Sequence, residues 1–185
     1  MVEFLVEAGH YRMAVERIYL VGFMGAGKTT VGRELSLRLQ RPFFDLDAEI
    51  EKAEGLPVAE IFGQFGEQRF RQLERTHLRR LSEQQGVIAL GGGAYIDPEN
   101  RRVADETGAV VWLDASLDAV HQRVMPDGSR PLLSNPKHVA QLYASRLPFY
   151  RLARIHVLTD NRLPDAIAQE IIRRVGDPEG GPDAG

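Results

Sequence analysis

The segment that most constrains the fold of this chain is Gly22–Thr29, which reads GFMGAGKT. It matches the pattern G-x-x-x-x-G-K-[ST] at every fixed position. A strand-like apolar run, Arg17–Val21, precedes it, and an amphipathic stretch, Thr29–Gln40, follows it. Glycines let the backbone turn tightly and direct its N–H groups at phosphate oxygens, and the helix adds its positive N-terminal end. This context predicts a nucleoside triphosphate site, with Lys28 at the β- and γ-phosphates and the Thr29 hydroxyl on Mg²⁺.

The loop by itself leaves the acceptor open, so a switch, a motor and a kinase all fit, beside a glycine-rich turn that binds nothing. Composition removes other chemistries. The 23 Lys and Arg against 26 Asp and Glu give a net charge of −3, without the basic excess of nucleic-acid or anionic-membrane binding. The absence of Cys excludes disulfides, thiolate nucleophiles and Cys-ligated metals. No apolar run reaches about 18 residues, so a soluble, cytoplasmic protein is expected.

The rest of the chain alternates short apolar runs with amphipathic stretches, which is typical of parallel strands joined by helices. The chain of 185 residues, 43% of them hydrophobic, fits one domain. Five strands are expected, at Arg17–Val21, Pro42–Leu46, Val87–Leu90, Ala109–Leu113 and Ile155–Thr159. Helices are expected over Thr29–Gln40, Phe65–Gln84 and Leu163–Val175. The pattern therefore predicts an α/β domain built on a parallel sheet.

Three segments depart from this alternation. The stretch Pro126–Pro136 reads PDGSRPLLSNP, whose prolines and glycine predict an exposed loop. The tail 176–185 holds turn-forming and acidic residues and is expected to be disordered. Residues 1–16 resemble neither a secretory signal nor a transit peptide and are expected to form a disordered extension, of which Met1–Arg12 should be dispensable and Met13 the natural start. The competing interpretation is that Phe4–Val6 packs as an extra helix turn or a dimer contact.

Two acids, Asp45 and Asp47, end the second predicted strand in FFDLD. Because alternate strand residues share a face, both carboxylates are expected to point toward the carboxyl edge of the sheet, where open α/β folds bind ligands. One acid could hold a metal-bound water and the other could accept a proton from an attacking hydroxyl. The alternative is that both merely cap the helix that follows.

A second glycine run, Gly91–Gly93, follows the strand VIAL and indicates close approach of a ligand to the backbone, or else a plain turn. Arg69 and Arg71 lie two positions apart on a predicted helix, so at most one of them faces a ligand. Arg130 lies in the proline-rich loop and Arg146 in a predicted helix that ends in RLPFYR. The five histidines show no metal-ligand spacing.

Together these residues resemble the shikimate kinase family. From about Ile18 to about Val175 the chain carries GFMGAGKTTVG, FFDLDAEIE, IFGQFGEQRFRQLE, ALGGGA, SRPLL and SRLPFYR in the family's order. The resemblance implies a P-loop fold of the nucleoside-monophosphate-kinase type, with a five-stranded parallel sheet in the order 2-3-1-4-5. It implies a single kinase domain over 17–175, a substrate-binding region near 45–80 and a lid near 125–137. It also implies a monomeric enzyme that uses Mg-ATP to phosphorylate the 3-hydroxyl of shikimate, on the route to chorismate and the aromatic amino acids.

The same resemblance assigns roles to individual residues. The implied ATP-binding positions are Gly25, Ala26, Gly27, Lys28, Thr29, Thr30, Arg123, Arg130 and Arg162, of which Arg123 and Arg162 would line the adenine pocket. The implied shikimate-binding positions are Asp47, Arg71, Gly92, Gly93 and Arg146, of which the two arginines would hold the carboxylate. The implied metal positions are Thr29 and Asp45. Asp47 would act as the base, assisted by Lys28 and by Arg130 from the lid.

Two rivals remain at this point. A related small-molecule kinase, such as a gluconate kinase, shares the phosphate loop, but the arginine pair with FFDLD favours shikimate. A nucleotide-binding switch is disfavoured because the chain lacks the N-K-x-D signature of switch GTPases. Leu163 stands where the family often has a polar residue, which leaves the contacts to the base open.

Overall fold

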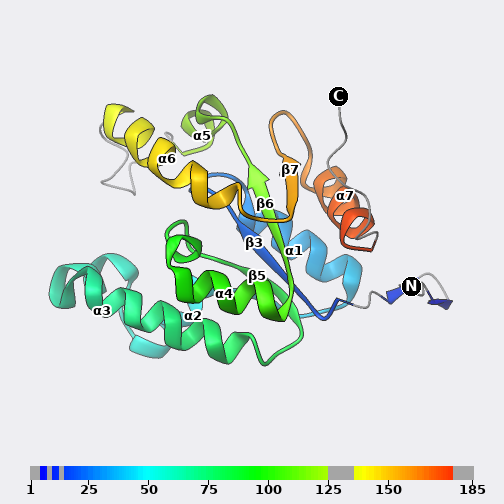
Figure 1. Ribbon diagram of the computed structural model, residues 1–185, viewed down its shortest axis with the longest axis horizontal. Helices are drawn as coiled ribbons and strands as arrows, with labels where there is room; N and C mark the ends of the chain where they lie inside the picture. The colour runs from blue at the N-terminus through cyan, green and yellow to red at the C-terminus, as the bar shows by residue number, and fades with distance from the viewer. Residues whose placement is uncertain (1–4, 8–9, 13–14, 125–135, 177–185) are drawn as a thin grey trace.

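Five parallel strands form the central sheet, in the order β4-β5-β3-β6-β7 (Figure 1). The strands are β3 (Arg17–Val21), β4 (Phe43–Asp45), β5 (Gly86–Ala89), β6 (Ala109–Asp114) and β7 (Ile155–Leu158). Counted along the chain among these five, the order is 2-3-1-4-5, which confirms the predicted topology. The structure is a computed structural model that describes residues 5–7, 10–12, 15–124 and 136–176.

The core lies around the central strand β3. Ile18, Tyr19 and Leu20 are fully buried, and β3 pairs with β5 on one side and β6 on the other. Parallel sheets are covered on both faces, so the inner strands β3, β5 and β6 read as continuous apolar runs, and this explains why these three could be located from the sequence to within one residue.

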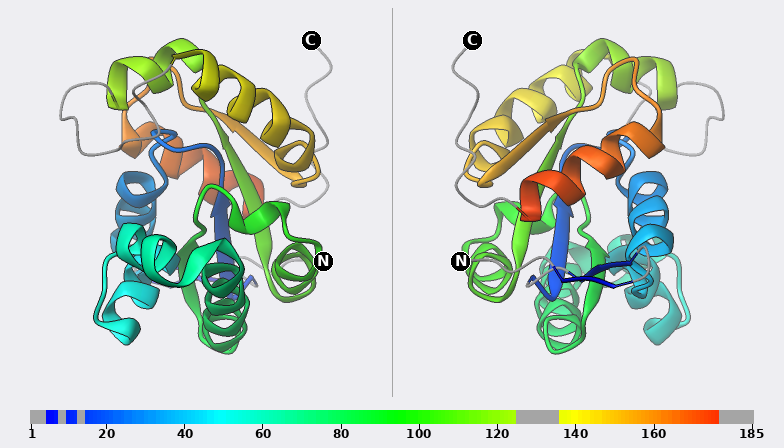
Figure 2. Two further views of the ribbon diagram at one scale, coloured as in Figure 1. Left: turned by 90° about the vertical axis from the view of Figure 1, so that its left-hand side faces the viewer. Right: turned by 90° about the vertical axis from the view of Figure 1, so that its right-hand side faces the viewer.

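Helices cover both faces of the sheet (Figure 2). They are α1 (Lys28–Leu39), α2 (Leu46–Glu54), α3 (Val58–Leu81), α4 (Pro98–Thr107), α5 (Leu117–Val124), α6 (Pro136–Tyr150) and α7 (Pro164–Gly176), with a 3-10 turn η1 at Ala94–Ile96. Helices α1 and α7 pack against each other, while α4 packs on β6 and α3 packs on α4. The first turns after the strands thus gather at the carboxyl edge of the sheet, where ligands of open α/β folds bind.

Helix α3 begins earlier than predicted, at Val58 rather than Phe65. Its backbone leaves helical geometry at Gly66, with φ 78° and ψ 171°, so it consists of two helical pieces joined by a kink. Gly63 and Gly66 weaken the helical pattern of the first piece, which is why sequence reasoning placed only the second.

The leading segment contains a two-stranded antiparallel hairpin, β1 (Leu5–Glu7) and β2 (His10–Arg12), which sequence analysis did not anticipate. Strand β2 contacts α1. That Met1–Arg12 is dispensable stays a prediction.

The predicted lid near 125–137, and Arg130 with it, lies outside the described residues except for its last two positions, which begin α6. The predicted disordered tail likewise lies outside them beyond Gly176. Within the described part of the chain, no helix has both the length and the apolar character needed to cross a bilayer.

Candidate active site

The glycine loop links the carboxyl end of β3 to α1, as the sequence predicted. Gly22 adopts φ 141°, and a Cβ there would lie 2.6 Å from the Leu113 carbonyl oxygen, so only glycine fits. Gly27, with φ 96°, is the N-cap residue of α1, and no side chain caps this end of the helix. The first N–H groups of α1 therefore face the loop, and an anion seated there would satisfy them.

Lys28 and Thr29, the first two residues of α1, turn their polar atoms toward this loop and its surroundings. The Lys28 ammonium donates to the carbonyl oxygens of Gly22 and Phe23, both at 2.9 Å, which holds its charge against the loop. The Thr29 hydroxyl donates to Asp45 Oδ2 at 2.8 Å. The two predicted metal positions are thus in direct contact. A hydroxyl and a carboxylate beside a phosphate loop fit Mg²⁺, which binds through one or two protein oxygens together with substrate phosphates.

Asp47 lies near the carboxyl edge of the sheet, as predicted, but on a helix and not on a strand. Strand β4 ends at Asp45 and α2 begins at Leu46, so Asp47 lies in the first turn of a helix and not on a strand face. The expectation that both acids share one strand face is therefore wrong. The alternative that they cap this helix is not borne out for Asp45, whose side chain makes no cap hydrogen bond although it is the N-cap residue of α2.

The run Gly91–Gly93 packs against the three predicted acceptor-site side chains, one per glycine. A Cβ on Gly91 would lie 2.5 Å from Asp47 Oδ1. A Cβ on Gly92 would lie 3.0 Å from Arg146 Nη1, and one on Gly93 would lie 2.8 Å from Arg71 Nη1. Since real Cβ atoms essentially never approach closer than 3.0 Å, at least the first and third positions require glycine for the side chains to lie as they do. The run therefore brings an acid and two arginines to one short stretch of backbone.

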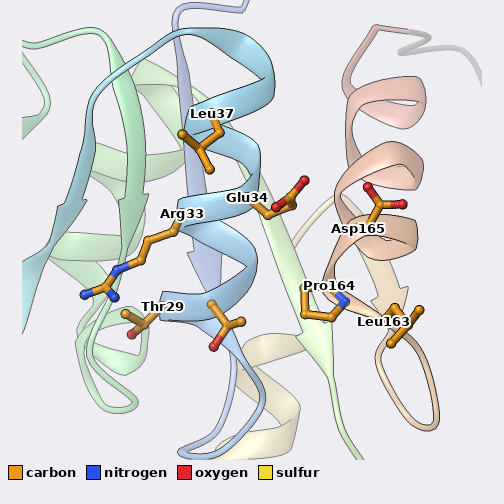
Figure 3. Close-up of a pocket in the computed structure, with 8 residues that line it drawn as sticks. Thr29, Arg33, Glu34, Leu37, Leu163, Pro164 and Asp165 are labelled. Carbon is orange, nitrogen blue, oxygen red and sulfur yellow. The ribbon is translucent and has the colours of Figure 1, made fainter.

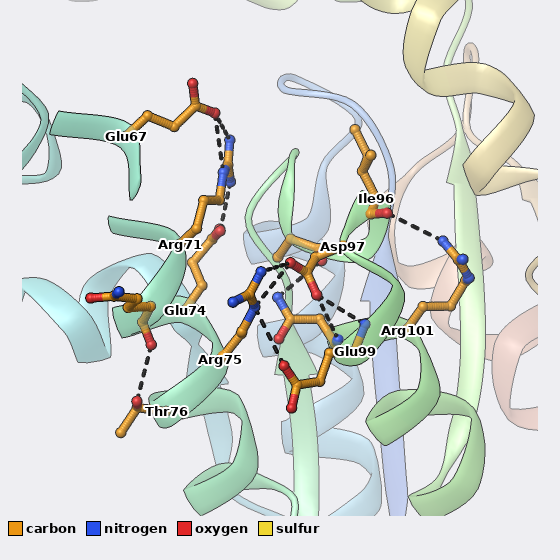
Figure 4. Close-up of polar contacts among 12 residues, drawn as sticks. Glu67, Arg71, Glu74, Arg75, Thr76, Ile96, Asp97, Glu99 and Arg101 are labelled. Atoms are coloured by element: carbon orange, nitrogen blue, oxygen red, sulfur yellow. Dashed lines mark hydrogen bonds and ion pairs between the residues drawn. The ribbon is translucent and has the colours of Figure 1, made fainter. Parts of the chain in front are cut away.

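Arg71 lies on α3 between two acids, as Figure 4 shows. Its Nη1 contacts Glu74 Oε2 at 2.6 Å and its Nη2 contacts Glu67 Oε1 at 3.0 Å. Burial works to lower the pKa of Arg71, but Glu74 and Glu67 together outweigh it and raise that pKa. Glu74 is only 1% exposed, and burial raises its pKa to about 7 in spite of Arg71. Arg69, two positions earlier, faces away and pairs with Glu54, as the helical spacing predicted.

Arg146 approaches from α6. Its guanidinium lies 5.6 Å from the ring centroid of Phe23, a residue of the glycine loop, in a cation–π contact. A cavity of about 540 Å³ opens between α3, α4 and α6 with both arginines on its wall. Its lining residues are Glu67, Arg71, Gly93, Ile96, Asp97, Pro98, Leu142, Ser145, Arg146 and Phe149. Two cations on one cavity wall suit a ligand carboxylate.

Asp97 is a site-supporting residue that sequence reasoning missed. Its Oδ1 caps α4 by accepting from the N–H groups of Glu99 and Asn100, while its Oδ2 accepts from Arg75 at 2.7 Å and 3.0 Å (Figure 4). Burial works to raise the pKa of Asp97, but the hydrogen bonds from Arg75 and the Asn100 N–H, together with the charges of Arg75 and Arg71, outweigh it and lower that pKa. The dipeptide Asp97-Pro98, a cap residue followed by proline at the first helical position, was the signal that could have found it.

The two arginines predicted at the adenine pocket make structural contacts. Arg123 donates to the carbonyl oxygens of Thr159 at 2.8 Å and Gly25 at 3.3 Å, which ties α5 to the end of β7 and to the glycine loop. Arg162 donates to the Leu158 carbonyl oxygen at 3.0 Å and pairs with Glu170 at 2.6 Å.

A second cavity, of about 470 Å³, lies between α1 and the start of α7 (Figure 3). It is lined by Thr29, Thr30, Arg33, Glu34, Leu37, Leu163, Pro164 and Asp165. Thr30 and Leu163 are exposed beside it, so a group continuing outward from the glycine loop along α1 would meet these side chains.

Gly25, Ala26, Gly27, Lys28 and Thr29 thus lie together in the phosphate loop and the first turn of α1, and Asp45, Asp47, Arg71, Gly92, Gly93 and Arg146 gather beside it. Arg130 lies outside the described residues. A P-loop at the carboxyl edge of a 2-3-1-4-5 sheet, next to an acid and an arginine pair, defines a small-molecule kinase of the P-loop class.

Comparison with known proteins identifies the family. Residues 24–176 match the family model of shikimate kinase, and the chain belongs to this family. A shikimate kinase of Sulfurihydrogenibium is 42% identical over 163 residues, covering 87% of this chain and 98% of the relative. One of Brucella abortus is 44% identical over 159 residues, covering 84% of this chain and 80% of the relative.

Solved structures agree with this assignment. The shikimate kinase of Acinetobacter baumannii in complex with shikimate has a TM-score of 0.84 and 37% identity, covering 90% of this chain and 96% of that one. A gluconokinase of Sinorhizobium meliloti has a TM-score of 0.60 at 18% identity, covering 88% of this chain and 94% of that one, a likeness of fold alone.

Proposed function

We propose that this protein transfers the γ-phosphoryl group of ATP to the 3-hydroxyl of shikimate. Family membership supports the reaction, and one observation in the site supports the acceptor: Gly91–Gly93 packs against Asp47, Arg146 and Arg71 in turn. A ring that carries a carboxylate at one end and hydroxyls at the other matches this arrangement. Its carboxylate would pair with Arg71 and Arg146, and a hydroxyl would reach Asp47.

Phosphoryl transfer depends chiefly on positioning and on charge stabilisation. The arginine pair fixes the acceptor so that its hydroxyl oxygen attacks the γ-phosphorus in line. The bond from that phosphorus to the β–γ bridging oxygen breaks, the hydroxyl proton passes to the Asp47 carboxylate, and ADP leaves. Lys28 and the N-terminal end of α1 stabilise the charge on the phosphate oxygens.

Mg²⁺ is the proposed metal, held by the Thr29 hydroxyl and through water by Asp45. When bound, it neutralises charge on the β- and γ-phosphate oxygens. The Thr29–Asp45 hydrogen bond keeps the hydroxyl and carboxylate oxygens close together beside the loop. Because the hydroxyl proton is donated to Asp45, the lone pairs of the Thr29 oxygen would be available to the metal.

For the nucleoside, we propose a position outward from Thr30, near Leu163 and Pro164, with Arg123 holding the loop that frames it. The cavity beside these residues has room for a group that continues from the phosphates. The expectations of a cytoplasmic monomer that binds neither nucleic acid nor membrane stay predictions, and light scattering on the purified protein tests the oligomeric state.

An assay of ADP release with Mg-ATP tests the acceptor. We expect the kcat/KM for shikimate to exceed that for gluconate by at least about 100-fold. Shikimate and gluconate both carry a carboxylate, but only the ring of shikimate holds one hydroxyl toward Asp47. Equal rates with the two acceptors would contradict the proposal.

A further inference from the structure

Tyr150, the last residue of α6, is buried against the central sheet with an exposed fraction of 1%. Its ring stacks on Trp112 of β6, with centroids 6.3 Å apart and an interplanar angle of 30°. Its hydroxyl donates to the Gly92 carbonyl oxygen at 2.5 Å. Burial raises the pKa of Tyr150 to about 12, so the hydroxyl keeps its proton and remains a donor at neutral pH.

The bond to Gly92 also fixes the N–H group of the next residue. The Gly92 carbonyl and the Gly93 N–H belong to one planar trans peptide unit, so they point in opposite directions. While Tyr150 holds the carbonyl on the α6 side, the N–H of Gly93 points in the opposite direction within the same plane. Gly93 lines the cavity that holds Arg71, and within the described chain its N–H donates to no protein acceptor.

An arginine lies beside the same peptide unit. Arg146 lies one helical turn before Tyr150 on α6, and its Nη1 lies 3.0 Å from the point where a Cβ on Gly92 would stand. The Phe23 ring contacts the same guanidinium at 5.6 Å. The peptide unit that Tyr150 holds is therefore next to one member of the proposed arginine pair.

We propose that Tyr150 is a positioning residue for the acceptor's carboxylate: its hydroxyl fixes the peptide unit that carries the Gly93 N–H, and this N–H donates to the carboxylate. The inference rests on the proposed function, because it takes Gly93 as a carboxylate donor beside Arg71 and Arg146. Tyr150 itself is too deeply buried to touch the acceptor, so its effect is transmitted only through this peptide unit.

The variant Tyr150→Phe tests the proposal because it keeps the ring and its stacking on Trp112 and removes only the hydroxyl. Initial rates are measured with Mg-ATP while shikimate is varied. We expect the KM for shikimate to rise about 5- to 30-fold, the loss that follows when a buried hydrogen-bonded group loses its partner. The kcat and the KM for ATP should stay within about twofold, since the phosphate loop is untouched. Partial misfolding would lower kcat and leave KM unchanged, so the KM remains informative.

Tyr143→Phe is the matched control. Tyr143 lies two turns earlier on α6 and also donates its hydroxyl to a backbone carbonyl, that of Ala115 at 3.0 Å, but not to the glycine run. Its removal should leave the shikimate KM within about twofold. An equal rise in both variants would mean that α6 is generally loosened and would overturn the proposal.

A neutral analogue of the acceptor shows whether the effect depends on the carboxylate. Replacing the carboxylate of shikimate by a carboxamide should lower the kcat/KM of the wild type strongly. In Tyr150→Phe, the same replacement should cause a loss of kcat/KM that is about 5- to 30-fold smaller. An unchanged cost, or an unchanged shikimate KM in Tyr150→Phe, overturns the positioning role. The variant Arg146→Lys separates the two proposals. If Arg146→Lys raises the shikimate KM and Tyr150→Phe does not, only the role of Tyr150 is contradicted. If Arg146→Lys leaves the shikimate KM unchanged, the proposed binding of the carboxylate by the arginine pair is itself contradicted.

Discussion

The three glycines Gly91, Gly92 and Gly93 act through the space that their missing side chains leave. From the sequence, the glycines were expected to let a ligand approach the backbone, and the structure shows that the side chains of Asp47, Arg146 and Arg71 lie against them. The two statements are compatible. Because the glycines lack Cβ atoms, their N–H groups stay within reach of a ligand that those side chains bind. The contact partners could not be known from the sequence, since they come from three separate helices.

Replacing Asp47 by Asn should lower kcat by about 10²- to 10⁴-fold, because the amide cannot accept the hydroxyl proton. ATP affinity should be unchanged, since Asp47 lies beside Gly91 and not in the phosphate loop. Steady-state kinetics and ATP titration measure the two effects. Glu49→Gln removes the same charge from the same first turn of α2 and should retain activity. Near-normal turnover of Asp47→Asn would rule out the role as base.

Arg71→Lys keeps the positive charge and loses the planar fork. The shikimate KM should rise about 10- to 100-fold, the range expected when hydrogen bonds to a charged group are lost. The KM for ATP should stay unchanged. Arg69→Lys, two residues away and paired with Glu54, is the control and should behave as wild type. A parallel loss of affinity for both substrates would point to a disturbed fold instead.

Glu74 makes the stability of the protein depend on pH. Its pKa is raised from 4.5 to about 7 in the folded state, so the folded protein binds this proton more tightly than the unfolded chain does. The contribution is present in full below about pH 4.5 and is lost as pH rises toward 7. Relative to Glu74→Gln, the wild type should lose on the order of 3 kcal/mol of unfolding free energy between pH 4.5 and 8. Urea unfolding of both proteins across this range measures it, and a difference that does not vary with pH would contradict the assignment.

At the scale of elements, strands were easier to predict than helices. The runs in β3, β5 and β6 are apolar throughout because both faces of the sheet are covered, and such runs are visible without any partner. Helix α2 and the first piece of α3 carry acids and glycines whose pattern is weaker. The misassigned face of Asp47 has the same origin, since a helix that begins within one residue of a strand leaves no turn signal between them.

The kink in α3 offers a test at this scale. Gly66 has φ 78° and ψ 171°, a backbone conformation essentially restricted to glycine that costs other residues about 1–3 kcal/mol, and no neighbour within 4 Å explains the glycine otherwise. Gly66→Ala should therefore lower the free energy of unfolding by about that amount. Gly63→Ala, in the same helix with the same open surroundings and no positive φ, should be neutral or stabilising by up to about 1 kcal/mol. Equal effects of the two substitutions in urea unfolding would show that the kink carries no strain.

At the scale of the whole molecule, the phosphate loop is a local motif, whereas the acceptor side is assembled from α2, α3, the segment after β5 and α6. The loop could therefore be read from eight consecutive residues, but the arginine pair needed the family resemblance, because surface arginines on two helices carry no signal of their own. The fold joins the two halves through Phe23, a residue of the loop whose ring meets Arg146 of the acceptor side.

The most direct test of the account is the identity of the product. The full chain is incubated with ATP, Mg²⁺ and shikimate, and the phosphorylated product is analysed by phosphorus–proton coupling in NMR. We expect a single product with phosphate on the 3-hydroxyl, formed at least about 10²-fold more slowly by Asp47→Asn. A phosphate on another hydroxyl, or ADP formation without a phosphorylated acceptor, would contradict the proposed placement of the ring between the arginine pair and Asp47.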